Sequence, residues 1–240
     1  MEFENSWGNP VKAEAYSKLE FPNTYYLAYR DLPEILAVHI QGVKAIDFGC
    51  GAGRSTRFLK NLGFDAVGID ISIDMLNKAR EMDPGGEYQL VTDGNYHGLG
   101  SHEYDLVQSI FTFDNIPGKE NRTHILKKLG ELLKPSGKLI CLDTNSEMYT
   151  RQWASFSTRE FPENKEAKTG DIVKIIVTDI DDPRPVEDIY WTLEDYKKLF
   201  ASAGFELEAV YAPKGKEGEP FTWITEKEIA PWIIYVLKVG

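Results

Sequence analysis

The sequence predicts an α/β fold in which short apolar strands alternate with amphipathic helices around one sheet. A first apolar run ends at Phe48 in a glycine-rich turn, and a second run, residues 65–69, follows after the next helical stretch. Residues 104–110 are apolar over most of their length, as expected of a strand that is buried on both faces. This alternation favours a largely parallel sheet with helices on both faces.

The glycine-rich turn is the most informative segment of the chain. It carries glycine at three alternate positions: Gly49, Gly51 and Gly53. Because glycine lacks a Cβ, the backbone can turn sharply and a ligand can approach closely, while the following helix presents free N–H groups. The dinucleotide fingerprint G-x-G-x-x-G/A requires a small residue where this chain has Arg54. Asp47, two residues before the turn, suits an ammonium group better than a phosphate.

Acidic residues also lie at the ends of the next two strands. Asp70 ends the second strand about twenty residues after the glycine turn, where an acid accepts the hydroxyls of a bound ribose. The third strand, residues 88–92, leads into Asp93 and Gly94. Carboxyl ends of parallel strands meet at one edge of a sheet, so we expect these acids and Asp47 to lie at one site.

The rest of the chain continues the alternation. The helix after the fourth strand has an apolar face made of Ile125, Leu126, Leu129, Leu132 and Leu133. Lys-Pro-Ser-Gly at 134–137 ends this helix, because proline cannot continue it, and a fifth strand covers 138–142. The last third contains a helix, 192–203, and two strands, 205–211 and 232–238, with no helix between them.

Together these segments resemble the class I S-adenosylmethionine-dependent methyltransferases over nearly the whole chain. The turn Gly49-x-Gly51-x-Gly53, two residues after Asp47, resembles motif I of that family. The stretch 132–139, Leu-Leu-Lys-Pro-Ser-Gly-Lys-Leu, resembles the motif before its fifth strand. The resemblance implies a Rossmann-like, seven-stranded sheet with helices on both faces and an antiparallel C-terminal hairpin. Dinucleotide-binding folds lack that hairpin, which disfavours a nicotinamide-dependent oxidoreductase.

The resemblance also implies S-adenosylmethionine as the cofactor. Asp47 and the glycine turn would hold its methionine part, and Asp70 its ribose. Met75 and Asp93 would contact the adenine. The full expected set is Asp47, Gly49, Gly51, Gly53, Asp70, Ile71, Met75, Asp93, Gly94, Ser109, Tyr16 and Arg30. Ordinary explanations stay open for some of these: a simple strand-to-helix turn for the glycines, core packing for Met75 and a surface position for Arg30.

We expect one domain, 1–240, with four parts. These are an N-terminal helical lid at 1–42, a cofactor-binding core at 43–143, an insertion after strand five at 144–191, and a C-terminal helix and hairpin at 192–240. The insertion is long for a strand-to-helix connection, and long connections are usually functional. Because it follows the carboxyl end of a strand, we interpret it as a cap over the substrate. A dimerisation or packing element is the alternative.

The candidate substrate contacts come from the loop after strand four and from this insertion: Phe111, Asp114, Trp153 and Phe156. Asp114 is the preferred acid, although a helix cap or a turn explains its presence equally well. The methyl group of a sulfonium is already activated, so the protein mainly has to align a nucleophile and exclude water. No catalytic base is assigned from the sequence.

Composition limits the partners and the setting. With 240 residues, 42% of them hydrophobic, the chain can bury one sizeable core, and no stretch is apolar enough to span a membrane. The net charge of −11 weighs against nucleic acid, because binding a polyanion relies on clustered Lys and Arg. The N-terminus has no secretory signal, and two cysteines are too few for a disulfide framework or a zinc site. We therefore expect a cytoplasmic protein without a metal.

The sequence thus predicts methyl transfer to a small-molecule nucleophile at O, N or C. Two alternatives share the fold: aminopropyl transfer from a decarboxylated cofactor, and a non-catalytic, nucleoside-binding regulatory subunit. Comparing the binding of S-adenosylmethionine with that of its decarboxylated form distinguishes aminopropyl transfer from methyl transfer. A labelled-methyl assay distinguishes a regulatory subunit from a methyltransferase. The substrate, the methylated atom and the oligomeric state do not follow from the sequence.

Overall fold

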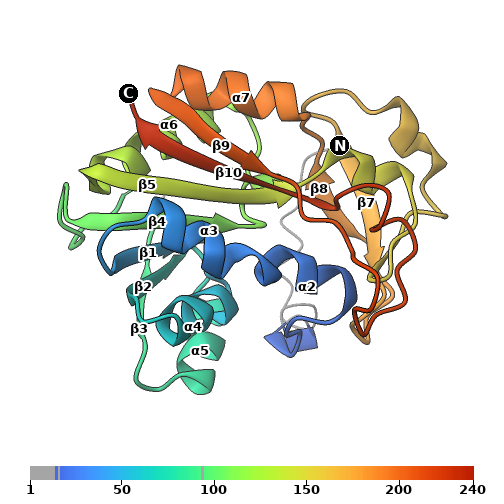
Figure 1. The fold of residues 1–240 in the computed structure, drawn as a ribbon, viewed down its shortest axis with the longest axis horizontal. Coiled ribbons are helices and arrows are strands. Elements are labelled where there is room, and N and C mark those ends of the chain that lie inside the picture. The colour runs from blue at the N-terminus through green and yellow to red at the C-terminus, as the bar shows by residue number, and fades with distance from the viewer. Residues whose placement is uncertain (1–13, 16, 93–94) are drawn as a thin grey trace.

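A seven-stranded sheet forms the centre of the molecule (Figure 1). The computed structural model describes residues 14–15, 17–92 and 95–240. The strand order is β3-β2-β1-β4-β5-β10-β9, with bounds β1 Lys44–Phe48, β2 Asp65–Asp70, β3 Glu87–Leu90, β4 Tyr104–Ile110, β5 Leu133–Thr144, β9 Phe205–Tyr211 and β10 Trp232–Val239. Strands β1 to β5 pair in parallel, whereas β10 runs antiparallel to both β5 and β9. The expected sheet and its antiparallel C-terminal pair are confirmed.

Helices cover both faces of this sheet. They are α2 Asn23–Arg30, α3 Leu32–His39, α4 Arg54–Asn61, α5 Ile73–Met82, α6 Lys119–Leu132 and α7 Leu193–Ser202. Successive strand residues point to opposite faces, so the central strands supply two separate cores. Ala45, Leu106 and Ile140 pack with residues of α2, α3 and α4. Ile46, Val107 and Leu139 pack with residues of α6 and α7, which lie on the other side of the sheet (Figure 1).

Local sequence features set the helix ends. Ser72 caps α5 by accepting a hydrogen bond from the backbone N–H of Met75. Thr192 and Asp195 form a reciprocal capping box at the start of α7. Gly204 has a φ of 88° and ends the same helix in a left-handed turn. The observed helix α7 therefore agrees with the range expected from the sequence.

The insertion after β5 forms a second, three-stranded antiparallel sheet of order β6-β7-β8. Its strands are β6 Phe156–Ser157, β7 Ile172–Val177 and β8 Val186–Ile189. The sequence of the insertion predicts a strand at 171–180, which alternates or runs apolar, and a possible partner strand at 188–191. Strands β7 and β8 overlap these ranges, but β8 begins two residues earlier. Figure 1 shows this small sheet beside the carboxyl ends of the parallel strands, next to α2.

A long connection, residues 212–231, joins β9 to β10 in place of a tight hairpin turn. It leaves the main sheet and runs along the insertion and α2 (Figure 1). Among the helices within the described residues, none is long and apolar enough to cross a membrane.

Candidate functional site

One cavity of about 670 Å³ lies at the carboxyl edge of the parallel strands. Its volume is in the usual range for small-molecule sites, roughly 300 to 1,000 Å³. One part is bounded by the glycine turn and the residues after β2, including Gly51, Asp70 and Met75. The other part is bounded by α2, the insertion and the start of β10. The cavity thus joins the expected cofactor position to the expected substrate cap.

Each of the three positions in the turn requires glycine for a different structural reason. All have positive φ, at 70°, 52° and 79° for Gly49, Gly51 and Gly53. A Cβ on Gly49 would lie 2.3 Å from the Thr112 side chain, and one on Gly53 would lie 2.6 Å from the Tyr88 hydroxyl. A Cβ on Gly51 would meet nothing within 4 Å. Gly51 borders the cavity directly, whereas Gly53 is required for packing and does not line it.

Asp70 links the end of β2 to the glycine turn. Its Oδ2 accepts a hydrogen bond from the Gly51 backbone N–H at 2.8 Å, and its Oδ1 accepts one from the Ser72 N–H at 2.8 Å. Burial raises the pKa of this carboxyl group, an effect that the two backbone donors oppose. A carboxylate has about four lone-pair positions, so Asp70 can still accept two hydroxyl groups from the cavity side. Ile71, 64% exposed, and Met75, buried, line the cavity beside it.

Replacing Asp70 by alanine is expected to weaken S-adenosylmethionine binding by about a hundredfold or more, because two charge-assisted hydrogen bonds worth roughly 1.5 to 3 kcal/mol each are lost. Isothermal titration calorimetry measures the change. Asp65→Ala is the matched control, since Asp65 starts the same strand at its other, exposed end. Affinity at the wild-type level in the Asp70 variant would exclude the ribose contact.

Asp47 does not face the cavity, contrary to the expectation that it would hold the methionine part of the cofactor. Its carboxylate is fully buried and accepts hydrogen bonds from the Ser55 and Thr56 hydroxyls, both at 2.6 Å, and from the Gln108 amide at 3.4 Å. Burial raises its pKa. Asp47 does not line the cavity, so it fastens β1 to α4 behind the glycine turn instead of facing the ammonium of a ligand. Ser109 is likewise buried in β4 and does not border the cavity.

Arg30 also differs from the expectation. Its guanidinium pairs with Asp31 and with Glu219, both at 2.7 Å, and it does not line the cavity. Arg54, the first residue of α4, borders the cavity in its place. The Arg54 guanidinium lies 5.1 Å from the ring centre of Tyr25 and donates to the Glu20 carbonyl at 2.8 Å. A buried cation therefore lies next to the glycine turn.

Four aromatic rings form a wall of the other part of the cavity: Tyr25, Phe111, Phe156 and Trp232. Phe111 and Trp232 have ring centres 4.6 Å apart, and those of Tyr25 and Phe156 are 5.1 Å apart. Phe111 has a φ of 58°, which is unusual for a bulky residue and costs about 1 to 3 kcal/mol. Backbone strain of this kind concentrates at functional sites. We therefore interpret the strained turn after β4 as a feature that places the Phe111 ring at the cavity.

Trp153, by contrast, is not a cavity residue. It is 2% exposed, its indole N–H donates to the Met148 carbonyl at 3.0 Å, and it packs within the core. Of the two aromatic residues expected to contact the substrate from the insertion, only Phe156 borders the cavity. Trp153 packs in the core beneath the insertion.

Asp114 lies at the bottom of the cavity, with its carboxylate already engaged. It accepts hydrogen bonds from the Thr144 backbone N–H at 3.0 Å, from the Thr144 hydroxyl at 2.5 Å and from the Tyr196 hydroxyl at 3.1 Å. Burial raises the pKa of Asp114. These contacts bind β5 and α7 to the turn after β4, which favours a structural role over substrate contact.

A second buried carboxyl group, Asp143, lies next to Asp114 and gives the protein a pH-dependent stability. Cys141 Sγ donates to its Oδ2 at 2.8 Å, while its Oδ1 has no hydrogen-bond partner among the described residues. Burial, and then the charge of Asp114, raise the pKa of Asp143 well above the ordinary aspartate value of about 4. The folded state holds this proton more tightly than the unfolded state. The free energy of unfolding should therefore fall as pH rises from about 4 through the folded-state pKa.

Asp143→Asn should remove this loss, because the amide cannot ionise. We expect the variant to melt above the wild type at pH 8 and close to it at pH 5, with about 2 to 4 °C for each kcal/mol relieved. Thermal unfolding at both pH values measures the difference. Equal offsets at pH 5 and pH 8 would contradict the assignment, because a packing effect has no such pH dependence.

Three expected cofactor residues, Tyr16, Asp93 and Gly94, lie outside the described residues. Many cavity residues were not assigned to the site from the sequence, among them Arg54, Tyr25 and Trp232. The position of Arg54 directly after the glycine turn could have indicated it. Trp232 reaches the cavity because β10 pairs with β5 so that Trp232 lies opposite Thr144, and that register is not visible in the sequence.

Comparison with known proteins identifies the family of the chain. A family described as Methyltransferase domain matches residues 22–210. An uncharacterized methyltransferase of Geobacillus thermodenitrificans is 26% identical over 188 residues, which are 77% of this chain and 76% of that protein. The demethylmenaquinone methyltransferase of Bacillus cytotoxicus is 33% identical over 111 residues, 43% of this chain and 46% of that protein. An S-adenosylmethionine-dependent methyltransferase from Clostridium acetobutylicum has a TM-score of 0.64 at 13% identity, covering 95% of this chain and 97% of that one.

The chain therefore belongs to the methyltransferase family, and its fold is that of the class I S-adenosylmethionine-dependent enzymes. It is an enzyme of this class, and S-adenosylmethionine is the cofactor of the class. The match to the Bacillus cytotoxicus enzyme covers less than half of either protein. The family match ends at residue 210, ahead of the connection 212–231.

Proposed function

We propose that the protein transfers a methyl group from S-adenosylmethionine to a small, largely apolar molecule. The observation that carries this proposal is the single cavity of about 670 Å³, in which the glycine turn and an aromatic wall face the same space. The first part offers Asp70 and the open side of Gly51, and the second offers rings from α2, the turn after β4, β6 and β10. A polyanion such as nucleic acid fits neither this enclosed space nor the net charge of −11.

The residues of the first part fit the cofactor. Asp70 accepts hydrogen bonds from the ribose hydroxyls, and Met75 packs against the adenine. Arg54 pairs with the carboxylate of the methionine part, in place of Arg30, which the resemblance placed among the cofactor residues. When bound, the cofactor supplies a methyl group on a positively charged sulfur. Gly51 keeps the space beside this group free, because its missing side chain would point to the cavity.

The rest of the cavity orients the acceptor and excludes water. Tyr25, Phe111, Phe156 and Trp232 are buried or half-buried, and their apolar surfaces hold a flat or hydrophobic molecule in front of the glycine turn. Fixing the acceptor in line with the methyl group provides most of the rate increase that such a reaction needs. The atom that is methylated, O, N or C, depends on which acceptor binds in the cavity.

Ring compounds with hydroxyl groups are the first acceptors to test. Relatives are named demethylmenaquinone methyltransferase and ubiquinone biosynthesis O-methyltransferase, although each match covers only 46% of the relative. An apolar, aromatic-lined cavity is compatible with such molecules.

A labelled-methyl assay tests the proposal. The protein is incubated with methyl-labelled S-adenosylmethionine and a panel of hydroquinones, phenols, apolar amines and a small-molecule extract, with Asp70→Ala as the inactive control. We expect label in an apolar acceptor and none with the control. Tight binding of the cofactor without any transfer would favour the regulatory alternative. Preference for decarboxylated S-adenosylmethionine in calorimetry would favour aminopropyl transfer.

A further inference from the structure

A fully buried carboxylate joins three separate segments of the chain. Glu226 is 0% exposed and belongs to the connection 212–231. Its Oε1 accepts from the Thr24 hydroxyl of α2 at 2.6 Å and from the Ala154 backbone N–H of the insertion at 2.7 Å. Its Oε2 accepts from the backbone N–H groups of Ile224 and Thr225, at 2.8 and 3.1 Å. Four donors therefore compensate one buried charge.

The same joint contains further hydrogen bonds between these segments. The Thr24 backbone N–H donates to the Ser155 hydroxyl, and the Ser155 N–H donates to the Thr24 hydroxyl, both at 3.0 Å. The Trp232 indole N–H donates to the Thr24 carbonyl at 2.8 Å. The Thr225 hydroxyl donates to the Gln152 carbonyl at 2.7 Å. Helix α2, the insertion and the start of β10 are thus fixed to one another at one place.

A second carboxylate of the same connection holds the other end of α2. Glu219 Oε1 accepts from the Arg30 guanidinium at 2.7 Å. Its Oε2 accepts from the Lys216 backbone N–H at 2.6 Å and from the Trp223 indole N–H at 3.2 Å. Helix α2 is therefore attached to the connection near its first turn, through Thr24, and at its last residue, Arg30.

These attachments lie directly behind the aromatic wall of the cavity. Tyr25 follows Thr24 on α2, Phe156 follows Ser155 in the insertion, and Trp232 donates to the joint itself. A buried carboxylate that loses one of its donors is strongly destabilised, so the joint is stable only when all three segments are together. This gives the wall one defined position.

We infer that residues 212–231 form a strap and that Glu226 is a positioning residue, which holds α2 against the insertion and so sets the width of the acceptor part of the cavity. The inference rests on the proposed function, because the cavity is read as the place where cofactor and acceptor meet. Ligands enter or leave this cavity when the joint at Glu226 opens. The strap lies beyond residue 210, where the match to the methyltransferase family ends.

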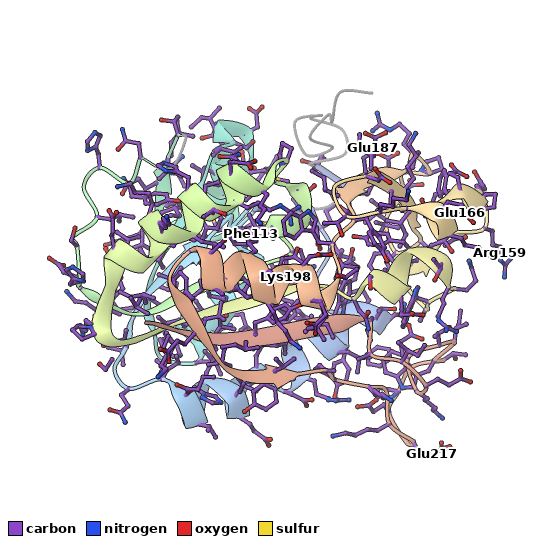
Figure 2. The ribbon with its side chains drawn as sticks, turned by 90° about the horizontal axis from the view of Figure 1, so that it is seen from above. Phe113, Arg159, Glu166, Glu187, Lys198 and Glu217 are labelled. Carbon is purple, nitrogen blue, oxygen red and sulfur yellow. The ribbon has the colours of Figure 1, made fainter. Side chains whose placement is uncertain are left out.

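Glu226→Gln tests the strap. The amide keeps one accepting oxygen and turns an N–H₂ group toward two of the four donors, so half of the joint is lost. Hydrogen exchange in α2 and residues 152–157, and the dissociation rate of S-adenosylmethionine, should both rise about tenfold, which corresponds to about 1.4 kcal/mol. Exchange in β1 and β4 should stay at the wild-type level. The matched control is Glu217→Gln in the same strap, whose side chain is 93% exposed and lies at its outer tip (Figure 2).

Two results would overturn the inference. Unchanged exchange in α2 would mean that Glu226 does not hold the helix, and an equal rise in the central strands would mean that it only stabilises the whole fold. If Glu226→Gln does not fold, Thr24→Val removes the hydroxyl that α2 contributes, and the same readouts decide. If the wild type fails to bind S-adenosylmethionine, the proposed function fails, while exchange in the free protein still decides on the strap.

Discussion

Gly51→Val is expected to abolish S-adenosylmethionine binding, with an affinity loss of about a thousandfold or more, while the protein stays folded. A Cβ at this position would meet no neighbouring side chain within 4 Å, and Gly51 borders the cavity, so we expect the valine side chain to extend into the cavity instead of the core. Valine is branched at Cβ and would occupy the space that the ligand needs beside the glycine turn. Calorimetric titration with S-adenosylmethionine measures the loss, and circular dichroism verifies the fold.

The backbone strain of this substitution needs its own control, because Gly51 has a φ of 52°. Gly63 provides it: its φ is 91°, a Cβ there also meets nothing within 4 Å, and it lies in the turn between α4 and β2. Gly63→Val should lose stability by a similar amount and bind the cofactor normally. If the two variants lose affinity equally, strain is the cause and the turn is not the cofactor site.

The sequence was a good guide wherever structure depends on neighbours along the chain. The apolar runs that end at Phe48 and Asp70 became β1 and β2, and Gly204 ended α7 where proposed. Asp70 lies at the cavity because the end of a parallel strand must face that edge. Hydrophobic periodicity and turn chemistry are local properties, and so they can be read without the tertiary structure.

Side-chain environments could not be predicted in the same way. Asp47 and Asp70 both follow the pattern of an acid near a strand end, but Ser55 and Thr56 of α4 fold back onto Asp47 and use its oxygens. The resemblance placed Arg30 among the cofactor residues, whereas in the structure its guanidinium pairs with Glu219, which is 189 residues away in the sequence. Contacts over such separations depend on how the strap crosses the fold.

The insertion shows the same limit. Trp153 and Phe156 are three residues apart in a segment without helical or strand periodicity, so nothing local indicates which ring faces the cavity. The structure separates them: Trp153 donates to Met148 within the core, and Phe156 contacts Tyr25 and Trp232 at the wall. The insertion therefore contributes one ring to the cavity and one ring to the core.

Trp153→Ala and Phe156→Ala should consequently have different effects on function. Both remove a large buried side chain and should lower the free energy of unfolding by about 3 to 5 kcal/mol. Of the two, only Phe156 lines the cavity. If the proposed acceptor binds there, Phe156→Ala should raise the acceptor KM or lower kcat, by about tenfold for each 1.4 kcal/mol of lost contact. Trp153→Ala should leave turnover per folded molecule unchanged.

Kinetics below the melting range of both variants, with the acceptor found in the labelled-methyl assay, measure this difference. Cofactor affinity is the internal control, since Phe156 lies across the cavity from Asp70 and the glycine turn on a separate sheet. Unchanged turnover in Phe156→Ala would exclude contact between the acceptor and this aromatic wall. A raised KM in Trp153→Ala as well would mean that loss of the Trp153 side chain shifts the whole insertion. Such a shift is plausible because the next residue, Ala154, donates its backbone N–H to Glu226 of the strap.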